Sequence, residues 1–349
     1  MRLTAIGKQF DFFNSVRVQS KFNSIASSFT WNAYFDPNNQ DHRQLFKPFQ
    51  YWPISIDEGS ERVLTGTIVS QGFRVGEEKE LSALKGYSTT GVLEDCPVPI
   101  DAYPLEFNNL NIEQIANQLV QLFGINLNID SAVQSQVSQS IPQVTVDIKD
   151  TPKMILDRVC AQRGLILSHD EFGNLLIVGN RAGQTPITFY DEDAPSTRIA
   201  LDVNGQRLYS EVTTQKQASL DTDNAAEERQ TNSLLRPGVF RPDVKIQTSG
   251  TNTDTLTAVR NAFSQQLRNI KIVVTTDRWF WLANRRLQLI RPNNSISVRS
   301  ENAYLPNRTT VFVESVTLRG TPKEQTAELV CVLPEVYNNT GTIRNPFNF

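Results

Sequence analysis

The sequence predicts an α+β protein, mainly β, in which two antiparallel β-barrel-like domains flank an inserted small α+β domain. Apolar and polar residues alternate near the N-terminus and again in the last third of the chain, which is the period of half-buried strands. Between these regions the period becomes that of amphipathic helices. The predicted boundaries are 1–101 for the N-terminal β-barrel-like domain, 102–182 for the α+β domain, 183–337 for the second β-barrel-like domain with one helix, and 338–349 for a C-terminal tail.

In the N-terminal region, strands are predicted at 16–18 and 29–35, where apolar side chains occupy alternate positions. A hairpin is predicted over 53–68, because a polar turn containing Gly59 separates two runs of β-forming residues. Together these segments predict an antiparallel sheet or a small barrel.

The α+β domain shows one helix-then-strand order twice. The first helix has Asn111 as its N-cap, an apolar stripe that includes Leu119 and Phe123, and Gly124 just past its end, before a strand at 125–129. The second helix begins with Thr151 as N-cap and Pro152, ends at Gly164, and precedes a hairpin formed by 165–167 and 175–178. The Ser- and Gln-rich segment 131–143 between them is expected to contain too little apolar surface to join a core.

Beyond Pro186 strand signals dominate, with one helix over 256–267 and a long exposed loop expected at 219–237. The last stretch, 334–349, is a tail that carries Tyr337, Phe347 and Phe349. The predicted strands after the helix are 271–276, 286–290, 295–299, 310–318 and 324–333, which favour a second barrel or sandwich.

Composition narrows the class of protein. The chain has 349 residues, of which 39% are hydrophobic and 20% charged, as in ordinary globular proteins of two or three domains. The net charge of -3 gives no summed basic field for non-specific nucleic-acid binding. Neither a membrane-spanning helix nor a secretory signal is expected, so folding in a cytoplasm is predicted.

The residues that usually carry chemistry are few and scattered. Cys96, Cys160 and Cys331 are too far apart for a metal motif and are expected to be reduced thiols. His42 and His169 lack the spaced partners of a ligand set, and no nucleophile–base pair is predicted. The sequence therefore predicts no enzyme, no catalytic residue, no cofactor and no metal.

Two groups of residues allow a functional and a structural interpretation. The acids at 94–95 and 191–193 could serve a glycosidase or a metal site, but neighbouring residues in a strand point to opposite faces, which favours solvated turns. Trp279 and Trp281, with nearby arginines, could form a stacking platform for a sugar or a single strand, although core or interface packing is the commoner role. Many Asn and Gln residues in predicted loops favour an interaction protein.

The order of several segments resembles a known family, the baseplate hub proteins of contractile-tailed bacteriophages, in particular the Mu-like tail proteins and the late-control D proteins. The segments that carry the resemblance are VLTG at 63–66, GYSTTGVLEDC at 86–96, LNIEQIA at 110–116 before FGI at 123–125, AQRGL at 161–165 before FGNL at 172–175, and LPEVY at 333–337. The resemblance extends over nearly the whole chain through order and spacing.

The resemblance implies a non-enzymatic structural protein of the virion tail baseplate. Its implied form is a homotrimeric ring in which two β-barrel-like domains per subunit adapt the six-fold tail tube to the three-fold central spike. Tail tube proteins, the central spike protein and baseplate wedge proteins are the implied partners. Candidate interface residues are the aromatic side chains Trp31, Trp279, Trp281, Tyr337, Phe347 and Phe349. The alternative is a carbohydrate-binding or glycoside-hydrolysing protein that uses the tryptophans or the paired acids.

Overall fold

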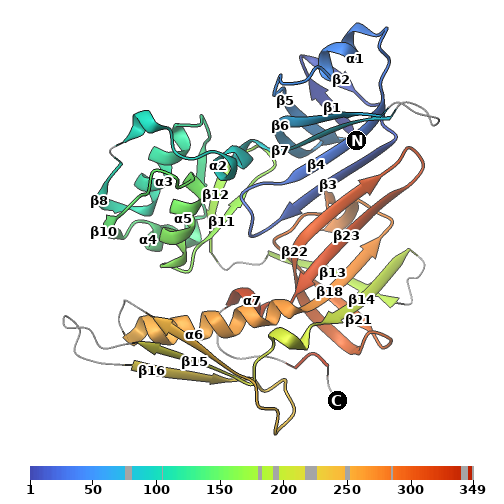
Figure 1. Cartoon of the computed structure of the whole chain (residues 1–349). Helices are drawn as coiled ribbons and strands as arrows, with labels where there is room; N and C mark the ends of the chain where they lie inside the picture. Colours follow the sequence, from blue (N-terminus) through green and yellow to red (C-terminus); the bar gives the residue numbers. More distant parts are fainter. Residues whose placement is uncertain are drawn as a thin grey trace. The chain divides into compact units, whose positions relative to one another are not determined.

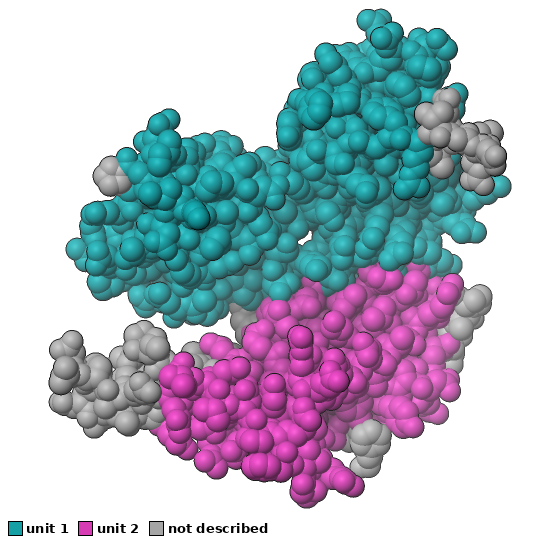
Figure 2. All heavy atoms as spheres, viewed as in Figure 1, with its two compact units in different colours: residues 1–180, 277–292, 315–327 teal, residues 181–276, 293–314, 328–349 magenta. Residues whose placement is uncertain are grey.

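The computed structural model divides into two compact units, each described here by itself (Figure 2). Unit 1 contains 1–180, 277–292 and 315–327, and unit 2 contains 181–276, 293–314 and 328–349. The residues that the structure describes are 1–74, 81–103, 105–179, 183–191, 196–216, 226–247, 252–283, 286–338 and 345–347. The four-part division expected from the sequence stays a prediction.

Unit 1 is built on a large antiparallel sheet, as predicted (Figure 1). Its strands, in spatial order, are the end of β22 (Leu305–Gly320), β3 (Ser15–Lys21), β4 (Ser28–Tyr34), β7 (Leu81–Ser88), β6 (Glu61–Phe73), β5 (Pro53–Glu58), β1 (Arg2–Ala5) and β2 (Lys8–Phe10). The predicted hairpin over 53–68 is confirmed as β5 and β6. The described strands form no closed barrel, so the structure confirms the antiparallel β class and not the barrel-like form.

Smaller elements complete unit 1 outside its inserted domain. They are α1 (Gln40–Leu45), the 3-10 turn η1 (Thr89–Gly91), and the hairpin of β19 (Phe280–Ala283) and β20 (Arg286–Leu289). Alternation along β3 and β4 buries Val16, Val18, Phe29 and Trp31 on one face of the sheet. The opposite face of these strands carries polar side chains, as the sequence pattern predicts.

The inserted domain of unit 1, from α2 to β12, is confirmed as α+β. Its elements are α2 (Val92–Asp95), η2 (Ile100–Ala102), β8 (Phe107–Asn111), α3 (Ile112–Gln121), β9 (Leu127–Ile129), η3 (Ser131–Val133), α4 (Gln134–Val137), β10 (Ser140–Val144), α5 (Pro152–Ala161), β11 (Ile166–His169) and β12 (Leu175–Val178). Asn111, the predicted N-cap of α3, forms a capping box with Gln114, and Thr151 caps α5 as predicted. Gly124 and Gly164 have positive φ after the two helices, as predicted.

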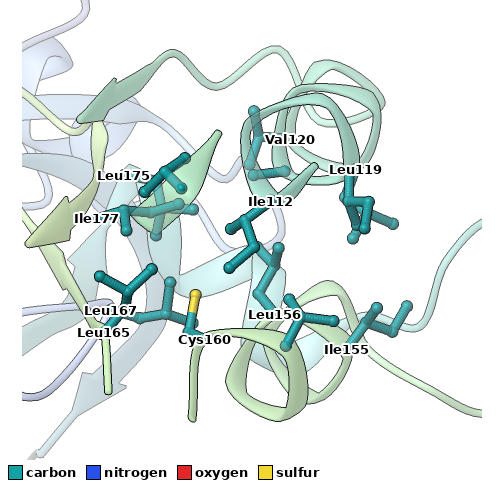
Figure 3. Close-up of a cluster of buried hydrophobic side chains, with 14 of the residues drawn as sticks. Ile112, Leu119, Val120, Ile155, Leu156, Cys160, Leu165, Leu167, Leu175 and Ile177 are labelled. Carbon is teal, nitrogen blue, oxygen red and sulfur yellow. The ribbon is translucent and has the colours of Figure 1, made fainter. Parts of the chain in front are cut away.

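The core of the inserted domain lies between α3, α5 and the β9–β11–β12 sheet (Figure 3). Leu119, Val120, Leu156 and Leu175 are among its buried side chains. One expectation about this domain is wrong. The segment 131–143 does join the core, because its three large aliphatic residues Val133, Val137 and Ile141 point inward and are buried. Sparse apolar residues suffice when all of them share one face.

Unit 2 contains the second β region with its predicted helix, and it also has a short helix at 335–338, where the sequence predicted only a tail. Its elements are β13 (Gly183–Tyr190), β14 (Thr197–Val203), η5 (Gly205–Arg207), β15 (Glu211–Lys216), β16 (Ala226–Thr231), β17 (Pro242–Gln247), α6 (Asn252–Gln266), η6 (Leu267–Asn269), β18 (Ile270–Thr276), β21 (Asn294–Ser300), the first part of β22, the end of β23 (Gln325–Val332) and α7 (Glu335–Asn338). The expected loop at 219–237 is corrected in part, because 226–231 forms β16, which pairs with β15.

The absence of a sequence signal for β16 has a simple physical reason. Its backbone pairs with Glu211–Lys216 while its largely charged side chains stay exposed, so the strand carries no apolar alternation that the sequence could show. No helix of the described residues is long and apolar enough to cross a membrane.

Candidate functional site

A polar joint within unit 1 connects the β11–β12 hairpin of the inserted domain to the large sheet. His169 ends β11, and both of its ring nitrogens are hydrogen-bonded. Nδ1 lies 2.7 Å from the carbonyl oxygen of Ser24, and Nε2 lies 2.6 Å from the hydroxyl of Ser27. Because a carbonyl oxygen only accepts, Nδ1 carries the proton in neutral His169, and the Ser27 hydroxyl donates to Nε2.

The serine side of the joint is itself connected to the sheet. The Ser27 hydroxyl lies 2.7 Å from that of Ser20, and the Ser27 backbone N–H donates to the Ser88 hydroxyl at 3.0 Å. These groups are buried or partly buried, so each hydrogen bond is stronger than it would be in water. The hairpin is therefore bonded to the β3–β4 connection, which Ser27 in turn ties to Ser20 and Ser88.

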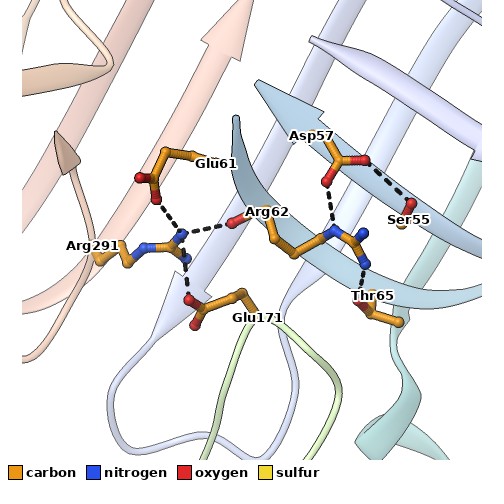
Figure 4. Close-up of polar contacts among 7 residues, drawn as sticks. All are labelled: Ser55, Asp57, Glu61, Arg62, Thr65, Glu171 and Arg291. Atoms are coloured by element: carbon orange, nitrogen blue, oxygen red, sulfur yellow. Dashed lines mark hydrogen bonds and ion pairs between the residues drawn. The ribbon is translucent and has the colours of Figure 1, made fainter. Parts of the chain in front are cut away.

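Charged groups form the second part of the joint (Figure 4). The Arg291 guanidinium donates to the carbonyl oxygen of Arg62 at 2.6 Å and pairs with Glu171 at 3.5 Å. It also pairs with Glu61 at 3.4 Å. All three side chains are partly exposed, so the ion pairs orient these side chains and add little to the stability of the fold.

The hairpin tip packs closely on the sheet. A Cβ at Gly173 would lie 2.7 Å from the hydroxyl of Thr89, so only glycine fits this approach. Asp170 orders the tip by accepting hydrogen bonds from the backbone N–H groups of Phe172 and Asn174. The joint therefore sets the orientation of the inserted domain within unit 1.

The joint should make stability depend on pH. Burial of the imidazole lowers the pKa of His169 below its usual 6.5, although the Ser24 carbonyl and Asp170 oppose the shift. The unfolded chain then binds the proton more readily, so stabilisation is complete above about pH 6.5 and is lost as the pH falls through the folded-state pKa. We expect the melting temperature of unit 1 to fall as the pH is lowered from about 7.5 to about 5.5. In the His169→Gln variant the melting temperature should change less over the same pH range. An equal change in both proteins would contradict this role.

The Ser27–His169 contact also has the distance of a nucleophile–base pair, which the sequence analysis did not predict. The two residues are 142 positions apart, so no local signal could reveal them. Ser27 is only 4% exposed, and it does not line either the groove beside Phe49 and Tyr51 or the groove on the polar face of the large sheet. This arrangement suits a structural hydrogen bond.

The structure places four of the candidate interface residues inside the chain. Trp31, Trp279 and Trp281 are buried in unit 1, and the Trp279 indole N–H donates to the carbonyl oxygens of Arg319 and Thr326. In unit 2 the Tyr337 hydroxyl donates to Glu314 at 2.6 Å.

The ring of buried Tyr337 stacks under Arg268, and burial together with Glu314 raises the pKa of its hydroxyl. Phe347 is partly buried, and Phe349 lies outside the described residues. An interface role for the six candidate aromatic residues stays a prediction. In this prediction the buried rings support a contact surface from below and do not touch a partner.

Among the described residues, the candidate acids and the other histidine do not come together into a catalytic set. Glu94 is exposed near Lys153. Asp191 accepts a hydrogen bond from Ser300 at 2.8 Å, while Glu192 and Asp193 lie outside the described residues. His42 lies in α1, not in a loop, and stacks on Phe12.

The described ranges hold no cluster of metal-ligating side chains. There, no three His, Cys, Asp or Glu side chains come together in a way that could hold a metal ion. All three cysteines are free thiols, and burial raises the pKa of Cys160 to about 12, which keeps it protonated.

The sequence analysis missed one exposed aromatic surface of unit 1. Phe49 is 86% exposed and Tyr51 is 61% exposed, and both border a shallow groove with Phe73. Both residues also have positive φ, 63° and 47°, which is strained for aromatic residues. Exposed aromatics held in a strained backbone are typical of contact surfaces.

Comparison with known proteins agrees with this fold. Residues 90–179, which include the inserted domain, match the family model of the second domain of gp44-like baseplate hub proteins. The resemblance to baseplate hub proteins that the sequence indicates is thereby confirmed. No curated protein matches the chain.

Solved structures extend the likeness to the whole chain. The 43 kDa tail protein of prophage MuSo2 from Shewanella oneidensis has a TM-score of 0.81 at 19% identity, over 97% of this chain and 98% of that one. A tail protein from Neisseria meningitidis MC58 gives 0.76 at 15% identity, with the same coverage.

A more distant neighbour comes from E. coli. This type VI secretion component, similar in structure to T4 bacteriophage tail proteins gp27 and gp5, gives a TM-score of 0.58 at 9% identity, over all of this chain and 80% of that one. At these identities the three likenesses establish the fold.

Proposed function

We propose that this chain is the structural hub of a phage tail baseplate, a homotrimeric ring that adapts a six-fold tail tube to a three-fold central spike. The observation that carries the proposal is the gp44-like hub domain at 90–179, set within a fold that follows a Mu-like prophage tail protein over nearly its full length. The two compact units each carry a β region, antiparallel in the large sheet of unit 1 and mixed in unit 2, where β13 pairs with β21 and β15 with β17 in parallel, and two such regions suit the two barrel-like domains that the ring requires.

The proposed symmetry follows from counting β domains. Three subunits with two similar β domains each present six similar surfaces, which can meet six tube subunits, while the trimer offers true three-fold symmetry to a spike. The proposed partners are tail tube, central spike and baseplate wedge proteins, and the proposed place is the virion baseplate, assembled in the host cytoplasm. The C-terminal tail after Tyr337 is proposed to reach a neighbouring subunit or tail protein.

Several features support a binding role over the carbohydrate alternative. Trp279 and Trp281 are buried, so they offer no face on which a sugar could stack. Large apolar side chains are instead exposed at Phe49, Leu282 and Leu287. Such side chains suit the centres of protein interfaces.

The oligomeric mass of the purified chain tests this proposal. One subunit has a mass of 39.3 kDa, so the trimer should scatter light as a particle of three times that mass, about 118 kDa. A stable monomer that binds or cleaves glycans would contradict the proposal and support the alternative.

A further inference from the structure

A second groove of unit 1, of about 710 Å³, lies on the polar face of the large sheet. It is bordered by β3, β4, β6 and β7 together with the β22–β23 turn, all of which belong to the same compact unit. Its charged lining consists of Arg17, Arg74, Lys85 and Arg319, against the single acid Glu324. The remaining lining is mostly small residues and neutral polar side chains such as Asn32, Thr30 and Gln325.

Strand register places three of the cations in one row across the sheet. Arg319 lies directly opposite Arg17, and Arg17 lies opposite Thr30. Thr30 in turn lies opposite Lys85 on β7. Residues that face each other on neighbouring strands point to the same side of the sheet. The row therefore presents Arg319, Arg17 and Lys85 together on the groove.

Three of the four groove cations have no ion-pair partner among the described residues. Arg17, Arg74 and Lys85 are exposed and form no ion pair there, and Arg17 reaches only the Gln19 side-chain oxygen at 3.4 Å. Like charges directly opposite each other destabilise a sheet. The whole chain nevertheless has a net charge of -3, so the row is a local feature and not a sign of general basicity.

We propose that this groove binds an extended acidic polypeptide segment of a partner protein. Neighbouring strands lie about 4.8 Å apart, so Arg319 and Lys85, three strands apart, are separated by about 14 Å. In an extended chain, side chains on one face repeat about every 6.7 Å, so carboxylates at positions i, i+2 and i+4 cover the same span. Alternating acidic residues therefore match the row.

The lining favours a polypeptide over a nucleic acid. No aromatic side chain lines the described groove, so bases would find no stacking platform. Glu324 at the rim would repel a continuous phosphate backbone, whereas a peptide can place a neutral residue there. The Asn, Ser, Thr and Gln side chains supply hydrogen bonds to a peptide backbone.

Fluorescence anisotropy with a labelled peptide of alternating Glu and Thr residues tests the proposal on the full chain. We expect Lys85→Glu to weaken binding by about tenfold or more, because it removes an attraction and adds a repulsion. The control is Lys271→Glu, which changes the net charge of the chain by the same amount at an exposed strand position of unit 2. It should change the affinity for the peptide by less than about twofold. Arg17→Gln, a milder change, should weaken peptide binding while leaving the melting temperature unchanged or higher, since it removes the repulsion with Arg319.

Three results would overturn the proposal. The first is that the folded chain does not bind the peptide. The second is that Lys85→Glu and Lys271→Glu weaken peptide binding equally. The third is that a single-stranded oligonucleotide binds more tightly than the peptide. A peptide of alternating Gln and Thr should not bind. None of these measurements depends on a trimer, so the groove and the hub assignment can fail separately.

Discussion

Leu119→Ala should lower the free energy of unfolding of the inserted domain by about 2–5 kcal/mol. The Leu119 side chain is fully buried in the core formed by α3 and α5, so truncation removes apolar contacts and leaves a cavity (Figure 3). Urea unfolding followed by a probe in this domain measures the loss. Phe123→Ala should lower the free energy of unfolding by less than a Phe→Ala change at a fully buried position. The reason is that Phe123 is only partly buried against the same core.

Leu122→Ala is the matched control for Leu119→Ala. Leu122 lies three residues later, at the C-cap of α3, and is 45% exposed. The same chemical change should therefore alter the free energy of unfolding by about 0.5 kcal/mol or less. Equal effects at the two positions would show that Leu119 does not face a core.

Gly86→Ala should destabilise unit 1 by about 3 kcal/mol or more, or prevent its folding. A Cβ at Gly86 would lie 1.9 Å from the Thr67 carbonyl oxygen and 2.6 Å from the Phe29 ring. The carbonyl belongs to the neighbouring strand β6, so it cannot move without disturbing the sheet. Thermal unfolding and the yield of soluble protein measure the effect.

Gly72→Ala provides the comparison on β6. Its Cβ would meet only the Ala83 Cβ, at 4.0 Å, which is an ordinary contact. Because alanine also restricts the unfolded chain, we expect this variant to be neutral or more stable by up to about 1 kcal/mol. A loss as large as that of Gly86→Ala would show that the sheet does not have this packing.

Local chemistry explains which parts of the fold were predictable. The helices α3 and α5 have caps, apolar stripes and terminal glycines that lie within a few residues of one another, and the sequence analysis found both. The β5–β6 hairpin likewise has its turn and alternation in one short segment. Each of these signals depends on residues that are neighbours in the sequence.

The features that the sequence did not predict depend on distant residues. Ser27 and His169 meet across 142 positions, and the basic row joins strands that contain residues 17, 85 and 319. The strand β16 has no apolar alternation, and it is held by backbone pairing with β15 and by polar side-chain contacts such as the Arg229–Glu211 ion pair. The core role of Val137 was missed because average composition does not show which way a few apolar residues point.

The assignment as a trimeric hub is tested most directly by the symmetry of the purified protein in averaged electron micrographs. We expect a closed three-fold ring with six similar β lobes around it, since each chain carries a β region in each of its two units. Isolated single subunits, or two-fold dimers with four lobes, would contradict it.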